Sequence, residues 1–447
     1  MTLQPSLHVR ASQQLRGLLR SDSAFLFGGL MLGNVIAYVY QMLMARELSP
    51  VEYGTLITLS SVSYVLAVVT RTAQVWVIRA VATTEAASAG RPRAAFIAAM
   101  RVLVPVAGAI LLIHWLSSGG VASFLHLRSA VPVIVLGLYT SSSVLLPVPR
   151  GVLLGLGRLQ FTGITYIVEP VVRLGTAMLL VLWGLGVDGA LAGYALGNVA
   201  AFAVALVPLW IVLRPHDDGV PSTGDRGKVD RYAWLAFIIN ASLMVLASID
   251  QIVVKHFFSG EVAGNYAVAF LLGRIIAFST ISLSWVIFTR SAIMSSDDPA
   301  RGRLLAKGLL VTAAIAVSVT AAYLLGPTLA VRIMGGGQYA TAATYVGLVG
   351  IEMTFYSLVY IQAYYQISVQ QMQVIWPLGC ATVLEIALLM RYHHSVQQVL
   401  LTLILVMAGL LVCVSALSWR SLRSGGPAAA GEIVDPDAPT VVAGSRG

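Results

Sequence analysis

The chain has 447 residues, of which 58% are hydrophobic and 11% are charged. Soluble domains carry roughly 25% charged residues, so this composition excludes a soluble globular protein. The apolar runs are long and continuous, which also excludes a transmembrane barrel built from short alternating strands. We therefore expect an all-α, multi-pass membrane protein, in which the net charge of +9 reflects a positive-inside bias and not nucleic-acid binding.

Taken in chain order, the apolar runs predict twelve transmembrane helices, each near the length of about 20 residues that crosses a bilayer. The first six are 23–45, 54–78, 94–116, 130–148, 160–183 and 188–212. A polar, Gly- and Asp-rich segment, 214–231, follows and is predicted to be a cytoplasmic linker. The last six are 232–257, 266–292, 304–324, 340–362, 374–390 and 396–419. The tail, 420–447, is rich in Gly, Ala and Pro and is predicted to be disordered.

A polar corner between the first two spans recurs in the second half of the chain. Ser49, with Glu52 three residues later, forms a capping box, the sequence signature of a helix N-terminus. A similar corner begins 210 residues later, at Ser259. This offset predicts two pseudo-symmetric lobes of six helices each, an N-lobe at 1–213 and a C-lobe at 232–419.

The distribution of basic residues predicts the orientation of the chain. With the N-terminus inside, 19 of the 28 Lys and Arg residues fall in inner segments, 5 in outer segments and 4 within spans. Cytoplasmic segments of membrane proteins are enriched in Lys and Arg. Both termini are therefore predicted to be cytoplasmic.

Polar and charged residues within the spans are the candidate site residues. A charge at the centre of a membrane helix costs roughly 2.5–3.5 kcal/mol, so it should face a cavity or a partner. Several of these residues recur at helical spacing and form polar stripes. The candidate substrate-binding residues are Asn34, Tyr38, Gln41, Tyr64, Arg71, Gln74, Arg173 and Arg274. Arginine suits a phosphate or diphosphate, because its planar fork donates two hydrogen bonds at once and stays charged.

Carboxylates within the spans are the candidates for ion coupling. Asp250 and Glu352 lie deep in their spans without a partner in the same helix, and Glu169 is a third candidate. Two structural alternatives stay open. Glu169 could neutralise Arg173 one helical turn away, and Asp250 could neutralise Arg274 in the adjacent span.

No enzymatic activity is predicted. The sequence contains no G-x-x-x-x-G-K-[ST] phosphate loop, so it has no ATPase of its own. No segment between the spans is long enough for a catalytic domain. We therefore expect no catalytic residue, metal ligand or cofactor.

Four short motifs carry a resemblance to a known family. They are the corner 45–54 (ARELSPVEYG), the corner 150–158 (RGVLLGLGR), the segment 186–190 (GVDGA), and Asp250 followed by 259–266 (SGEVAGNY). They resemble motifs of the polysaccharide-biosynthesis (Wzx-like) oligosaccharide flippases of the MOP superfamily. The resemblance covers all twelve spans and leaves out the tail.

The resemblance implies two lobes facing each other across a V-shaped cavity. It also implies alternating access that flips an undecaprenyl-diphosphate-linked oligosaccharide across the bacterial inner (plasma) membrane. The partners would be the lipid-linked glycan, membrane lipids, and the glycosyltransferases and polymerase of the same pathway.

The main alternative is a cation-coupled drug or metabolite antiporter of the MATE branch of the superfamily. Such proteins tend to place an essential acid in the first or seventh span. The first span has no acid between Phe25 and Ala45, whereas Asp250 leaves a C-lobe cation site open. A cavity lined by arginines would serve a cationic drug poorly. A membrane glycan polymerase or ligase would carry a large external loop, and a scaffold would not need polar stripes.

Overall fold

The computed structural model describes residues 7–82, 91–210, 231–292, 294 and 300–423. These residues form helices and short connections, with no strand among them. The first lobe contains α1 (Leu7–Glu47), α2 (Pro50–Ala82), α3 (Arg91–Phe124), α4 (Val131–Leu145), α5 (Pro147–Gly155), α6 (Leu159–Leu180) and α7 (Gly186–Leu209). The second contains α8 (Arg231–Leu246), α9 (Ile249–Phe257), α10 (Gly260–Ala292), α11 (Ala300–Leu325), α12 (Pro327–Gly335), α13 (Ala343–Ser368), α14 (Ile375–Arg391) and α15 (Val396–Arg423). Most of the predicted linker and tail lies outside the described residues.

The helices account for the twelve predicted crossings. Eleven stretches of the described residues are long and apolar enough to cross a membrane, and one of them, Leu159–Leu209, has 51 residues. At about 1.5 Å per residue this stretch is too long for one crossing. The chain reverses at Gly184 and Gly186, whose φ angles are +89° and +50°, so α6 and α7 are two antiparallel crossings.

Two of the crossings contain a break. One consists of α4 and α5, which are interrupted before Pro147, and the other of α8 and α9, which are interrupted at Ala247 and Ser248. The corner predicted at 150–158 is shorter than expected, because α5 continues to Gly155 and only residues 156–158 connect it to α6. Proline is tolerated in a first helical turn, where its missing N–H group has no intrahelical partner to lose.

The predicted capping box at the first corner is confirmed. The Ser49 hydroxyl donates to the Glu52 carboxylate at 2.7 Å, and the Ser49 amide donates to the same oxygen at 3.0 Å. At the second corner the amide of Val262 donates to the Ser259 hydroxyl at 3.4 Å. Both corners thus satisfy amide groups that would otherwise be unpaired at the start of a long helix.

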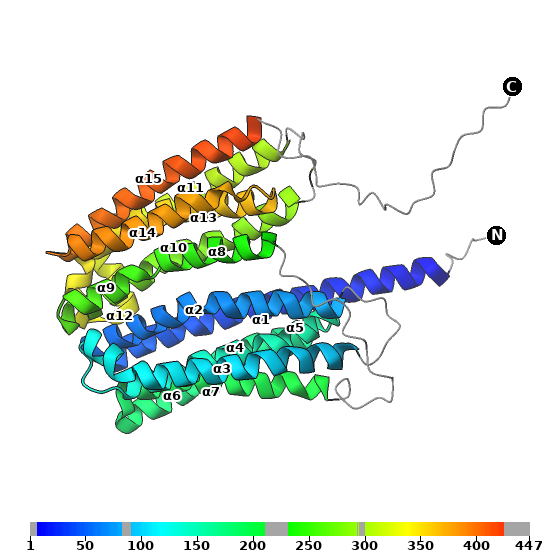
Figure 1. Ribbon diagram of the computed structural model, residues 1–447, viewed down its shortest axis with the longest axis horizontal. Helices are drawn as coiled ribbons and strands as arrows, with labels where there is room; N and C mark the ends of the chain where they lie inside the picture. The colour runs from blue at the N-terminus through cyan, green and yellow to red at the C-terminus, as the bar shows by residue number, and fades with distance from the viewer. Residues whose placement is uncertain (1–6, 83–90, 211–230, 293, 295–299, 424–447) are drawn as a thin grey trace.

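The two lobes lie side by side (Figure 1). We call the end that carries the Ser49 and Ser259 corners the corner end, and the opposite end, where α1 begins and α15 ends, the terminal end. At the corner end the lobes are joined by hydrogen bonds. Arg46 donates to the carbonyl of Ile333 at 2.9 Å, and Gln338 donates to the carbonyl of Ala45 at 2.7 Å. Deeper along the same interface, the amide of Gln251 donates to the Thr58 hydroxyl at 3.0 Å.

Helices α2 and α10 form the seam between the lobes, and the 210-residue offset makes them equivalent. Gly54 and Gly264, which this offset relates, face each other across the seam. A Cβ atom on Gly264 would lie 2.0 Å from the carbonyl oxygen of Pro50, and one on Gly54 would lie 2.8 Å from the amide nitrogen of Gly264. Only hydrogen fits at this distance. Equivalent residues meet in this way at a two-fold axis.

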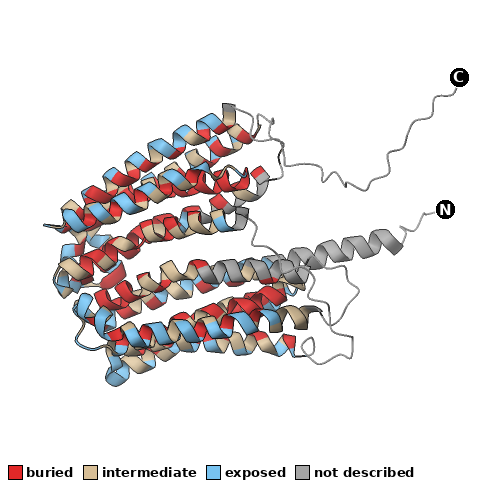
Figure 2. Cartoon of the chain, viewed as in Figure 1, coloured by how far each residue is buried: buried red, intermediate tan, exposed pale blue. Residues whose placement is uncertain are grey.

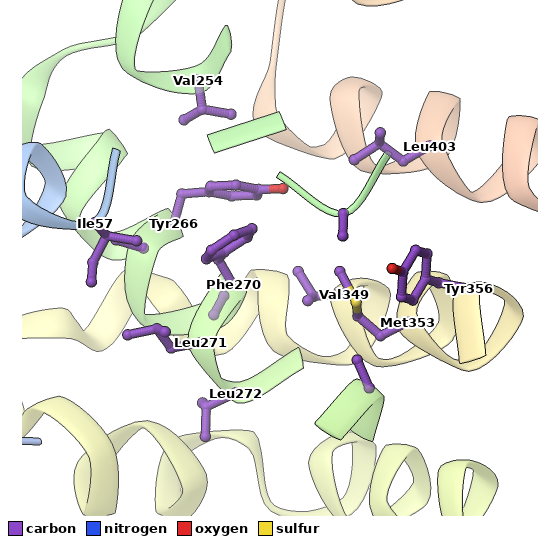
Figure 3. Packing of buried hydrophobic residues seen from close by; sticks show 14 of the residues in the cluster. Ile57, Val254, Tyr266, Phe270, Leu271, Leu272, Val349, Met353, Tyr356 and Leu403 are labelled. Carbon is purple, nitrogen blue, oxygen red and sulfur yellow. The ribbon is translucent and has the colours of Figure 1, made fainter. Parts of the chain in front are cut away.

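The main apolar core includes buried residues of both lobes, and most of them belong to the second lobe, around α10 and α13. Figure 3 shows Tyr266, Phe270, Val349, Met353 and Tyr356 packed together. In α13, 20 of the 26 residues are buried. A charged side chain on this helix is therefore enclosed by protein.

The outer surface is apolar, as a membrane-facing surface must be. Exposed residues lie on the outside of both lobes, and buried residues lie inside them and along the seam (Figure 2). Four tryptophans near helix ends are 59–77% exposed: Trp183, Trp210, Trp376 and Trp419. Tryptophan at this position is typical of the two membrane interfaces.

Candidate functional site

A cavity of about 250 Å³ lies between the lobes at the α2–α10 seam. Five of the candidate substrate-binding residues line it: Tyr38, Gln41, Tyr64, Arg173 and Arg274. They come from α1, α2 and α6 of the first lobe and from α10 of the second. Arg173 and Arg274, one from each lobe, both line this cavity.

Three other candidates are not in this lining. Asn34 is exposed on α1, one turn nearer the terminal end than Tyr38. Gln74 lies where α2 packs on α5, close to Gly151. The polar stripes on α1 and α2 extend beyond the cavity. Helical spacing repeats along a whole helix, whereas the cavity is lined by only part of each helix. The side chain of Arg71 lies outside the described residues.

Arg173 is held by aromatic rings. Its guanidinium carbon lies 4.7 Å from the ring centre of Tyr194 and 5.4 Å from that of Tyr40, within the range of cation–π attraction. Gln41 donates to the Tyr194 hydroxyl at 2.9 Å and so fixes that ring. The Arg173 guanidinium forms no ion pair or hydrogen bond within the described residues, although Glu169 lies close enough to interact with its charge. Its positive charge is therefore available to a ligand.

Arg274 lies on the lobe opposite Arg173 and is held by hydrogen bonds within its own lobe. Its Nη2 atom donates to the carbonyl of Ala247 at 3.1 Å and to the hydroxyl of Ser248 at 2.6 Å. The break between α8 and α9 leaves the Ala247 carbonyl free to accept this bond. The guanidinium also lies 4.2 Å from the ring centre of Tyr64, which belongs to the first lobe. Tyr64 and Arg274 are related by the same 210-residue offset as the glycine pair, so they too meet on the seam.

Neither alternative pairing of the cavity arginines is observed. Glu169 forms an ion pair with Arg150 at 2.9 Å and not with Arg173. Arg150 also donates to the hydroxyl and the carbonyl of Thr165. The sequence placed Arg150 in an inner corner, and that assignment is wrong. In the sequence, the only sign that Arg150 belongs to a helix is its position directly after Pro147 and Pro149, which lie in the first turn of α5.

Asp250 does not pair with Arg274 through a salt bridge. One of its carboxylate oxygens accepts a hydrogen bond from the Tyr266 hydroxyl at 2.5 Å, and the other has no partner in the described part of the chain. Glu352 and Glu385, from α13 and α14, are 2% and 0% exposed. All three carboxylates are close enough to interact electrostatically. The sequence did not single out Glu385 as a site residue, because only packing brings α14 to α9 and α13.

Five buried polar atoms in the cavity lining have no hydrogen-bond partner among the described residues. They are the Tyr38 hydroxyl, the Gln41 carbonyl oxygen, the Ser60 hydroxyl, and the Nε atoms of Arg173 and Arg274. Buried polar groups are rarely unpaired, so these atoms require water or a ligand. Four of the five can donate a hydrogen bond, which suits an anionic ligand.

No group of three His, Cys, Asp or Glu side chains is arranged to hold a metal ion within the described ranges. The two cysteines, Cys380 and Cys413, are free and exposed.

Comparisons with known proteins agree with this architecture. A sequence model of the family described as "Polysaccharide biosynthesis protein" matches residues 19–289. A search of curated proteins finds no match.

The solved structures that resemble the chain share its fold at low sequence identity. An inward-facing multidrug resistance MATE family transporter of the MOP superfamily has a TM-score of 0.73 at 10% identity, over 88% of this chain and 95% of that one. Lipid II flippase MurJ, in an inward closed conformation, scores 0.65 at 12% identity, over 90% and 89%. An outward-facing MATE transporter scores 0.53 at 12% identity, over 91% and 96%.

Proposed function

The chain belongs to the polysaccharide biosynthesis protein family, and we propose that it flips an undecaprenyl-diphosphate-linked oligosaccharide across the bacterial inner (plasma) membrane. Its family and fold neighbours are transporters and flippases of the MOP superfamily, so it is a membrane flippase and not an enzyme. The lipid-linked glycan is the proposed substrate.

One observation carries this proposal: two arginines without carboxylate partners line one cavity from opposite lobes. A diphosphate carries about two negative charges, and its passage through the bilayer core is prohibitive without compensation. Arg173 and Arg274 would replace its hydration shell with charge-assisted hydrogen bonds. The tyrosines around them present flat apolar faces on which sugar rings can stack.

The arrangement of the lobes supports alternating access. With the termini in the cytoplasm, as the basic residues predict, the corner end faces outward and is closed by Arg46, Gln338 and Gln251. The structure then corresponds to a state in which the cavity is loaded from the cytoplasmic side. A diphosphate held by both lobes would tie substrate binding to the movement that opens the corner end.

We propose Asp250 and Glu352 as the coupling residues. A charged carboxylate is costly in an apolar interior, so a proton or a cation must neutralise it when the lobes move. Glu169 is a weaker candidate, since Arg150 already compensates its charge. A cation-coupled drug antiporter is favoured only by the fold and by Asp250. The unpaired arginines in the cavity oppose it.

A flipping assay in proteoliposomes tests the proposal. The substrate is a fluorescent disaccharide on undecaprenyl diphosphate, and the readout is the fraction that an impermeant quencher can reach over time. Loss of one charge-assisted hydrogen bond costs about 1.5–3 kcal/mol, so Arg173→Ala and Arg274→Ala should each weaken substrate binding about ten-fold or more. The double variant should not flip.

Lysine at position 173 should restore flipping only in part, since it keeps the charge but loses the planar fork. Arg391→Ala is the matched control, because Arg391 is exposed at the end of α14. Full flipping by a well-folded double alanine variant would refute the anion site.

A further inference from the structure

Arg274 belongs to two environments at once. It lines the cavity from the second lobe, and it is anchored at the break between α8 and α9 by Ala247 and Ser248. Asp250 follows two residues later, in the first turn of α9. The Arg274 charge interacts with the carboxylates of Asp250 and Glu352. One guanidinium therefore lies between the cavity and the buried acids.

The buried acids form a cluster with more negative than positive charge. Asp250, Glu352 and Glu385 come from α9, α13 and α14, and both Glu385 oxygens lack a partner in the described structure. The titratable groups that face the cluster are Tyr266, Tyr356 and Arg274, and Tyr64 lies beyond Arg274. Only Arg274 among them carries a positive charge. Three buried carboxylates therefore share one buried cation.

We propose that the charge state of Asp250, Glu352 and Glu385 sets the affinity of Arg274 for an anion in the cavity. When the carboxylates are ionised, they attract the Arg274 guanidinium and compete with the ligand for its charge. When protons neutralise them, Arg274 is free to bind the anion. The inference rests on the proposed function and deepens it, because it names what regulates the anion site.

The sign of this coupling follows from linkage. If neutralising the acids strengthens anion binding, then a bound anion must strengthen proton uptake by the same factor. Substrate loading and proton uptake then favour each other on the cytoplasmic side. A carboxylate cluster with no link to the cavity would leave anion affinity unchanged.

Inorganic pyrophosphate is the probe, and its affinity for the purified full-length protein is measured by calorimetry at one pH. Glu385→Gln is the cleanest variant, because it removes charge without removing a hydrogen bond. Asp250→Asn and Glu352→Gln complete the set. Typical coupling between sites spans about 5- to 150-fold, so each variant should bind pyrophosphate about five-fold more tightly than the wild type. Glu261→Gln, an exposed carboxylate on the same helix as Arg274, should bind like the wild type.

A second set of variants in the Arg274→Ala background separates coupling from general disturbance. There the three substitutions should no longer change the affinity, since the residue through which they act is gone. Unchanged affinity in all three single variants, with weakened binding by Arg274→Ala, would overturn this inference and leave the proposed anion site intact. Equal binding by the wild type and Arg274→Ala, or none by either, would overturn both. Melting temperatures establish that each variant is folded.

Discussion

At the scale of single residues, the environment of each arginine decides its role. Arg150 and Arg173 lie in the same lobe. Arg173 is four residues from Glu169 along α6, and Arg150 forms an ion pair with Glu169. Arg150 pairs with the carboxylate through Nη2 and makes two further hydrogen bonds with Thr165. Arg173 is left with two tyrosine rings, which attract its charge but leave its N–H groups free. The first is therefore structural, and the second is suited to a ligand.

The ion pair between Arg150 and Glu169 predicts a stability effect without a transport effect. Breaking a fully buried pair by removing one partner costs about 3–5 kcal/mol, because the other charge is left uncompensated, and the 23% exposure of the Glu169 side chain lowers this cost here. Arg150→Ala should therefore lower the melting temperature strongly. Arg150→Ala combined with Glu169→Ala should recover part of the loss, and the folded fraction should keep its dependence on an imposed ion gradient.

The measurement is thermal unfolding in detergent, followed by flipping in proteoliposomes with and without a proton gradient. Loss of gradient dependence in a stable Glu169→Ala protein would contradict the structural role. It would then place Glu169 with the coupling residues.

At the scale of elements, the seam between α2 and α10 is set by glycine. A helix interior normally favours Ala over Gly by about 1 kcal/mol, so glycine at position 264 needs a packing reason. The 2.0 Å approach of a Cβ atom to the Pro50 carbonyl supplies it. The obstacle is backbone, which cannot move aside as a flexible side chain can.

We predict that Gly264→Ala prevents the lobes from closing at the corner end. Overpacking of this kind costs typically 1–3 kcal/mol, enough to shift a two-state equilibrium about ten-fold. Distances between spin labels on α1 and α12 should increase, and flipping should slow. Gly409→Ala on α15 is the control, because a Cβ atom there meets nothing within 4 Å. An unchanged distance distribution in Gly264→Ala would rule out the seam as the closing contact.

At the scale of the whole molecule, the two lobes must separate at the corner end for substrate to leave. Thr58 and Gln251 lie on opposite lobes and are joined by a 3.0 Å hydrogen bond. A reducible bifunctional thiol reagent that spans the length of the lost glutamine side chain should cross-link Thr58→Cys to Gln251→Cys and stop flipping, and a reductant should restore it. The background must have Cys380 and Cys413 replaced by Ser, since both are free and exposed. Flipping at the normal rate by the cross-linked protein would contradict alternating access.

The orientation of the molecule can be tested separately. The excess of Lys and Arg in segments at the terminal end predicts that this end faces the cytoplasm. Cysteines at Ser49 and Ser259 should react with an impermeant thiol reagent added to whole cells or right-side-out vesicles. A cysteine at Gln160, exposed at the terminal end, should react only after the membrane is opened. The reverse labelling pattern would invert the transport direction proposed above.

Local signals were sufficient for much of the architecture. Apolar run length determined the number of crossings, capping chemistry determined where α2 and α10 begin, and the 210-residue offset predicted the equivalence of the two corners. The same offset relates Gly54 to Gly264 and Tyr64 to Arg274, although their contact across the seam became visible only in three dimensions. Arg173 and Arg274 could be singled out because a charge in a membrane helix needs compensation wherever it lies.

Tertiary structure alone decided which charges are compensated and by what. Glu169 lies one turn from Arg173 in sequence, yet it pairs with Arg150 because α5 continues the crossing past its prolines and brings Arg150 to α6. Asp250, Glu352 and Glu385 are separated by up to 135 residues, and only the packing of α9, α13 and α14 brings them together. Spacing along one helix fixes which side chains share a face. The partners across helices depend on how the helices pack, and no local pattern encodes that.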